Sequence, residues 1–135
     1  MTNASENSLF ARFAGNPPAS RGEIEETQEK INFRFPASYV EFMLARNGGE
    51  GFIGRSYLVL WKIEDLIAIN GSYQVAEFAP GIFLFGSSGG GEAFGFDIRS
   101  DACGIVSIPF VAMEIEDAKI VAPNFEVFLS TLFAS

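Results

Sequence analysis

Hydrophobic residues recur at helical spacing after Ser20, where Ile24 and Ile31 fall on one face of a predicted helix. Ser20 and Glu23 have the spacing of a capping box, in which each side chain accepts a hydrogen bond from the other residue's backbone N–H. The charged residues between Ile24 and Ile31 fall on the opposite, solvent-facing side of this helix. The pattern therefore predicts an amphipathic helix that begins at Ser20.

Two further apolar stripes also predict helices. One begins at Pro36, which suits a first helical turn, and we expect Asn47-Gly48-Gly49 to end it because these residues adopt the left-handed conformation easily. The other begins at Pro123 and runs to the C-terminus. The first stripe comprises Tyr39, Val40, Phe42, Met43 and Leu44, and the second comprises Phe125, Phe128, Leu129, Leu132 and Phe133.

The middle of the chain reads as short strands separated by glycine-bearing turns. A short helix over 63–69, ended by Asn70-Gly71, interrupts them. The predicted strands are 57–61, 83–85, 93–98 and 105–110, with 113–120 as a further candidate. Helices, then a run of strands, then a closing helix indicate an α+β domain whose antiparallel β-sheet is a meander with helices packed against it.

The N-terminal region is predicted to be an extension of this domain. Residues 3–15 read as a short helix with Leu9, Phe10 and Phe13 on one face, and 16–20 as a stiff linker because it contains two prolines. We therefore divide the chain into an extension over 1–19 and an α+β domain over 20–135.

Composition narrows the class of protein. Hydrophobic residues make up 48% of the 135 and charged residues 19%, which excludes a disordered chain, and fifteen phenylalanines predict an aromatic core. No apolar run approaches the roughly 20 residues that span a bilayer, and no secretory signal pattern is visible. A single cysteine, Cys103, suits a reducing compartment. We expect a cytoplasmic protein that contacts no membrane.

Charge is distributed unevenly along the chain. Residues 1–63 contain seven acidic and seven basic residues, whereas 64–135 contain ten acidic and two basic, so the whole net charge of −8 lies in the second half. This charge repels nucleic acid and attracts basic proteins, although acidic surface also serves solubility alone. The candidate partner-binding residues are the acids at turns and strand ends, namely Glu77, Glu92, Asp101, Glu114, Glu116 and Asp117.

The glycine-rich stretch 86–91 has the glycine spacing of a phosphate-binding loop. That loop continues with Lys and then Ser or Thr, but here Glu92 and Ala93 follow, and a carboxylate repels phosphate. The residues after it alternate like a strand. We therefore interpret the stretch as a turn between two strands and expect no bound nucleotide or other cofactor.

Residues that carry catalysis are scarce. The chain has no histidine, so Ser-His and Cys-His pairs are excluded, and one cysteine cannot form a thiolate zinc site. The acidic pairs Glu64-Asp65 and Glu116-Asp117 are more typical of solvated surface than of a hydrolase. We predict no catalytic residues and no metal ligands, and hence no enzyme.

The ordered motifs resemble the SUKH superfamily, which includes the Smi–Knr cell-wall-assembly regulators and many bacterial immunity proteins. The segment FPASYVEFMLARNGG (35–49) is similar to the family signature LP-x-x-Y-x-x-F-L-x-x-N-G-G, with Phe35 and Met43 in place of its leucines. The segments LVLWKIEDLIAIN (58–70) and GIFLFGSSGGGEAFGFDI (81–98) and the aromatic closing helix also fit. The resemblance covers about residues 20–134.

The resemblance implies an α+β fold without a catalytic site and a function in protein binding. One hypothesis is an immunity protein that neutralises a bacterial toxin, for example a basic nuclease. The alternative is a regulatory or scaffold module of the same fold that binds another cellular protein. We expect Tyr39 and Phe42 to be core residues, so the signature identifies no contact residue. The partner and the oligomeric state stay open.

Overall fold

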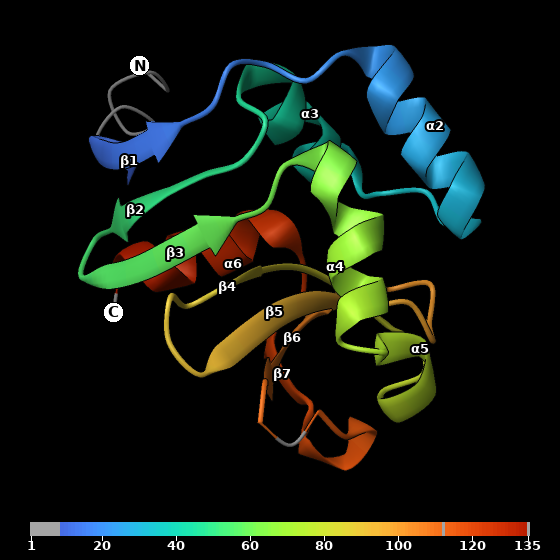
Figure 1. Ribbon diagram of the computed structural model, residues 1–135. Coiled ribbons are helices and arrows are strands. Elements are labelled where there is room, and N and C mark those ends of the chain that lie inside the picture. Colours follow the sequence, from blue (N-terminus) through green and yellow to red (C-terminus); the bar gives the residue numbers. More distant parts are fainter. Residues whose placement is uncertain (1–8, 112, 135) are drawn as a thin grey trace.

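The computed structural model describes residues 9–111 and 113–134 and is built on one antiparallel sheet (Figure 1). Each strand pairs with the next one along the chain, so the spatial order β1 to β7 is a meander. The strands in the described residues are β1 (Arg12–Gly15), β2 (Gly49–Ile53), β3 (Ser56–Leu60), β4 (Ile82–Ser87), β5 (Glu92–Asp97), β6 (Ile105–Pro109) and β7 (Lys119–Ala122). This confirms the predicted α+β fold with a meander sheet.

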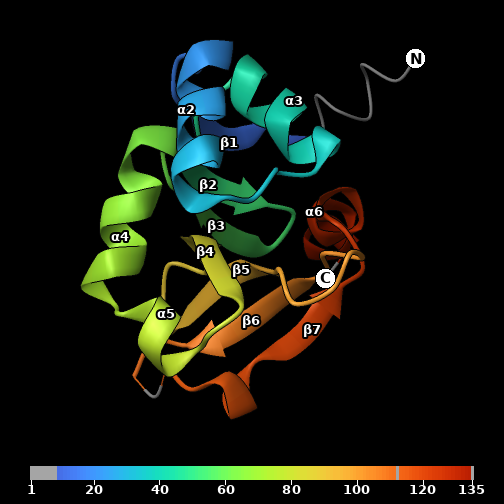
Figure 2. The same ribbon diagram turned by 90° about the vertical axis from the view of Figure 1, so that its right-hand side faces the viewer.

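Helices cover the sheet and connect its strands (Figures 1 and 2). Among the described residues they are α2 (Arg21–Ile31), α3 (Ala37–Ala45), α4 (Leu66–Ser72), α5 (Val75–Phe78) and α6 (Phe125–Ala134), with 3-10 turns η1 (Ile63–Asp65) and η2 (Ile115–Asp117). The predicted start of α2 is confirmed. The Glu23 N–H donates to Ser20 Oγ (3.1 Å), and the Ser20 N–H donates to Glu23 Oε1 (2.9 Å).

The sheet separates two hydrophobic clusters, because successive side chains of a strand point to opposite faces. Phe83 and Phe85 of β4 belong to the larger cluster, which α3 and α6 complete, whereas Ile82 and Leu84 belong to a smaller cluster that includes Val75 of α5. Both faces of the central strands are therefore buried, as the run of buried residues along β4 shows.

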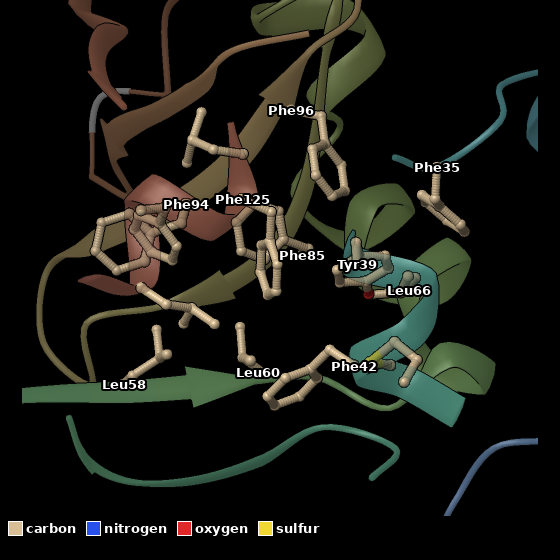
Figure 3. Close-up of a cluster of buried hydrophobic side chains, with 14 of the residues drawn as sticks. Phe35, Tyr39, Phe42, Leu58, Leu60, Leu66, Phe85, Phe94, Phe96 and Phe125 are labelled. Carbon is tan, nitrogen blue, oxygen red and sulfur yellow. The ribbon is translucent and has the colours of Figure 1, made fainter. Parts of the chain in front are cut away.

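The larger cluster is aromatic, as predicted from composition (Figure 3). Ring centroids lie 4.6 Å apart for Phe85 and Phe96, 5.1 Å for Tyr39 and Phe96, and 5.2 Å for Tyr39 and Phe125. These rings come from α3, β4, β5 and α6. Phe85 of β4 also makes edge-to-face contacts with Phe125 and Phe128 of α6, in both cases with ring centroids 5.7 Å apart, so these contacts fix the closing helix to the sheet in addition to buried area.

The predicted N-terminal helix over 3–15 is wrong over Arg12–Gly15, which form β1, whereas Leu9 is helical and residues 3–8 lie outside the described residues. β1 pairs antiparallel with β2, with Phe13 opposite Gly51. A Cβ on Gly51 would lie 2.3 Å from the Arg12 carbonyl oxygen, so this close pairing needs glycine in β2. Long-range pairing therefore overrides the local helical pattern. The boundary between 1–19 and 20–135 stays a prediction.

The end of α3 also differs from expectation. The helix ends at Ala45 with an extended Arg46, and Asn47 is not among the left-handed residues. The Asn47 side chain is buried and bonds to the η1 turn, while Gly48 has φ +73°. Gly49 already belongs to β2. The Asn-Gly-Gly motif therefore joins α3 to the sheet and to η1 instead of forming a left-handed cap at Asn47.

Two other predicted boundaries shift. Asn70 lies within α4, where its amide donates to the Leu84 carbonyl and its Oδ1 accepts from the Leu84 N–H, so it ties α4 to β4 instead of ending the helix. The candidate strand over 113–120 is formed only from Lys119 onward, because η2 occupies Ile115–Asp117.

Candidate protein-binding surface

All six acids predicted to contact a partner are exposed. The strand register places some of them together. Glu92 begins β5 opposite Pro109 of β6, and Ser107 of β6 lies opposite Lys119 of β7, so the turn that carries Asp117 lies at the same end of the sheet as Glu92.

Glu92 and Asp117 line one shallow hollow of about 300 Å³. Its other lining residues include Phe94, Pro109, Lys119 and Val121. Phe94 packs against Phe128 of α6, with ring centroids 4.8 Å apart, so the hollow opens on the face of the sheet that α6 partly covers. The hollow thus has an apolar floor and two carboxylates at its rim.

The remaining candidate acids divide between this end of the sheet and the opposite one. Glu114 and Glu116 lie at the start of η2, next to Asp117. Asp101 lies in the connection after β5, at the opposite end of that strand from Glu92, and Glu77 lies in α5. The structure therefore groups Glu92, Glu114, Glu116 and Asp117 by position, and it does not bring Asp101 and Glu77 to the same end.

The negative charge of this end has few neutralising partners. In the described part of the chain, none of the six acids forms an ion pair within 4.0 Å. Arg99, one of the two bases of the second half, is held by Asp97 at 2.8 Å and 2.9 Å, and these hydrogen bonds keep the pKa of Asp97 below its ordinary value. The other base of the second half, Lys119, lies in β7 at this end.

Apolar side chains that sequence reasoning missed lie beside these acids. Ile120 is 61% exposed and Val121 is 39% exposed. Both belong to β7, the last strand of the sheet. We call the surface formed by Glu92, Glu114, Glu116, Asp117, Ile120 and Val121 the β7 edge. The strand signal was visible in the sequence, but not its position at the margin of the sheet.

A second groove of about 450 Å³ runs between α3 and α6. Phe42, Leu129 and Phe133 form its apolar lining, and Glu41 and Glu126 lie at its rim. None of the six predicted acids lines it.

The glycine stretch is a turn between β4 and β5, as predicted. Its backbone donors bond within the turn, because the Gly89 N–H donates to Ser87 Oγ (3.1 Å) and the Gly90 N–H donates to Ser88 Oγ (3.2 Å). Gly89 has φ +81°, and a Cβ there would lie 2.6 Å from the Tyr57 ring. The glycine is therefore explained by packing against β3.

Three observations concern metal binding, membrane crossing and the cysteine thiol. Within residues 9–111 and 113–134, no group of three or more His, Cys, Asp or Glu side chains is placed to hold a metal ion. In the same residues, no helix has the length and apolar character that crossing a membrane requires. Cys103 is half-buried, and burial, followed by the charge of Asp97, raises the pKa of its thiol.

Comparison with known proteins gives a consistent result. Residues 18–131 match the SMI1 / KNR4 family (SUKH-1). The chain is also similar to the uncharacterized protein YnaB of Bacillus subtilis (strain 168), with 32% identity over 124 residues that cover 90% of this chain and 81% of that protein. The match extends from the linker before α2 into α6 and includes the β7 edge. The chain therefore belongs to the SMI1/KNR4 (SUKH-1) family.

Proposed function

We propose that this chain is a non-enzymatic, cytoplasmic protein-binding module, and specifically an immunity protein that binds and neutralises a cognate bacterial toxin domain. The observation that carries the proposal is membership of the SUKH-1 family over most of the chain, since SUKH proteins are generally immunity proteins. The β7 edge is the surface that we propose for the contact.

The distribution of charge supports a basic toxin such as a nuclease. A nuclease needs a positively charged groove for its substrate, because phosphate contacts dominate nucleic-acid binding. The β7 edge presents four exposed acids against one lysine. A protein that covers such a groove blocks the substrate without any chemistry. The absence of histidine from the sequence agrees with neutralisation by binding.

The alternative is a regulatory or scaffold protein of the same fold, as the Smi–Knr members of the family suggest. The two functions share a protein partner and differ in what that partner does. In the first case the partner is toxic when it is produced alone, and in the second case it is an ordinary cellular protein.

Affinity capture from the source cell, with identification by mass spectrometry, tests the proposal. The double variant Glu116→Lys with Asp117→Lys should lose the partner. The control Glu25→Lys with Glu26→Lys should retain it, because it makes the same charge change on α2. The captured partner should arrest growth when expressed alone, and co-expression of this chain should restore growth. A non-toxic partner would favour the regulatory alternative, and a partner lost equally by both variants would contradict the proposed surface.

A further inference from the structure

β7 is the last strand of the sheet on its side, and in the described residues its one strand neighbour is β6 (Figure 2). A strand in this position has one row of backbone N–H and C=O groups that its own sheet does not pair, and such a row is a template for another strand. The structure thus offers backbone hydrogen-bonding groups beside the acids described above.

The side chains of β7 show that this edge is not fully protected against pairing. Natural edges are commonly blocked by charged residues or bulges, and β7 has one of each. The charged residue is Lys119, and the bulge is at Val121, because the adjacent β6 residues Ile105 and Val106 lie opposite Ala122 and Ile120. Ile120, however, lies opposite Val106, whose side chain is in the smaller cluster, whereas Val121 lines the hollow on the other face. Exposed apolar groups therefore flank the edge on both faces of the sheet.

The charges around the strand select its partner. Asp117 lies two residues before β7, Glu92 lies across the hollow from it, and Glu114 and Glu116 lie in the preceding turn. Glu92 and Asp117 favour lysine or arginine on the face of the sheet that carries the hollow, while Ile120 favours apolar residues on the other face. Basic and apolar residues should therefore alternate along an incoming strand. A second copy of this chain fits poorly, since each copy has a net charge of −8.

The opposite margin of the sheet has a different character. β1 is the other terminal strand, and it contains Arg12, whose guanidinium lies 4.7 Å from the centre of the Phe52 ring. Arg46 packs nearby on Phe10 at 4.4 Å. This margin lies in the charge-balanced half of the chain.

We propose that an extended segment of a protein partner, with basic and β-branched residues in alternation, binds by adding a strand to the sheet along β7. This inference rests on the proposed protein-binding function and specifies how the contact is made. Main-chain hydrogen bonds supply the affinity, and the acids around β7 supply the preference for a basic sequence.

The probe for this inference is a capped peptide of about ten residues that alternates lysine and valine, a length that covers one strand. Binding to the isotope-labelled protein is followed by NMR, together with hydrogen exchange of the amides in 119–122. We expect saturable binding with slowed exchange in β7. Two control peptides should bind about tenfold more weakly, one with proline at the central valine and one with glutamate for lysine.

Protein variants locate the contact. Glu116→Lys with Asp117→Lys should weaken binding of the lysine–valine peptide by about tenfold, whereas Glu25→Lys with Glu26→Lys should leave it unchanged. The inference is overturned by no binding at about 1 mM peptide, by binding that leaves β7 exchange unchanged, by equal binding of the proline peptide, or by pairing of the protein with itself through β7. The peptide result does not depend on any toxin. A captured toxin that leaves β7 amides unprotected would defeat this inference and leave the proposed function standing.

Discussion

Asn47 links α3, η1 and the linker that precedes α2, and removal of its side chain, which bonds to η1, is the sharpest test of how the fold is held together. Its Oδ1 accepts from the buried Ile63 N–H at 2.8 Å, and its Nδ2 donates to Glu64 Oε1 at 2.7 Å. Its main-chain groups bond separately to Asn16 and to the Pro17 carbonyl. The substitution Asn47→Ala therefore deletes the two side-chain bonds and retains the two main-chain ones.

The expected cost follows from these two bonds. A buried N–H that loses its partner costs about 1–3 kcal/mol, and here that group is the Ile63 N–H. The bond to Glu64 is partly exposed and contributes about 0.5–1 kcal/mol. Asn47→Ala should thus lower the free energy of unfolding by roughly 1.5–4 kcal/mol. At about 4 °C per kcal/mol for a domain of this size, Tm should fall by roughly 6–16 °C.

Urea unfolding, followed by the fluorescence of Trp61 and by far-UV circular dichroism, measures this loss. Glu64→Gln is the matched control, because it retains a side-chain oxygen that can accept from Asn47, and it should change stability by less than about 0.5 kcal/mol. An Asn47→Ala variant within about 0.5 kcal/mol of the wild type would refute the linking role. An equal loss in Glu64→Gln would place the energy in the carboxylate charge instead of the Ile63 N–H.

Three further predictions concern the core and its pH dependence. Phe42→Ala should lower the free energy of unfolding in urea by about 3–5 kcal/mol, because it leaves a cavity in the aromatic cluster. The substitution Glu41→Ala, at the neighbouring exposed position, should cost less than about 0.5 kcal/mol. Equal costs would contradict the assignment of Phe42 to the buried face of α3. Tyr39→Phe should be neutral or stabilising by about 1 kcal/mol, because the buried Tyr39 hydroxyl has no hydrogen-bond partner in the described residues; a clear loss of stability would reveal a partner. The hydrogen bond from Asn47 lowers the pKa of Glu64, so the stability that this bond confers is present above the ordinary carboxyl pKa and is lost as pH falls through the lowered pKa. The stability difference between wild type and Asn47→Ala should therefore shrink in acid. A difference that grows in acid would contradict this explanation.

Elements with local signals could be predicted from the sequence. The capping box at Ser20 and Glu23 and the aromatic stripes at 36–44 and 123–134 depend on residues close together in the chain, and each gave the correct element. The strands β1 and β2 could not be predicted in this way. In a short window, Gly49 and Gly51 indicate the end of a helix or strand. Their role in allowing β1 to pair closely with β2 is visible only in the folded structure.

The candidate surface likewise has some features that the sequence shows and others that depend on the fold. The excess of acids after residue 64 is a property of the sequence, but the proximity of Glu92 and Asp117 depends on the register of β5, β6 and β7. The exposure of Ile120 and Val121 depends on β7 being the last strand, which no short window of sequence reveals. Asn47 likewise acts through Ile63 and Glu64, which lie 16 and 17 residues away.

The association rate constant between this chain and its captured partner, measured by stopped flow over a range of salt concentrations, tests most directly the claim that the acidic surface binds a basic protein. For the wild type, the rate should fall by about tenfold or more as salt screens charges beyond about 8–10 Å. For Glu116→Lys with Asp117→Lys, the rate at low salt should be slower and its salt dependence flatter. A rate that neither salt nor this charge reversal changes would contradict the account and would leave the acidic half of the chain a role in solubility alone.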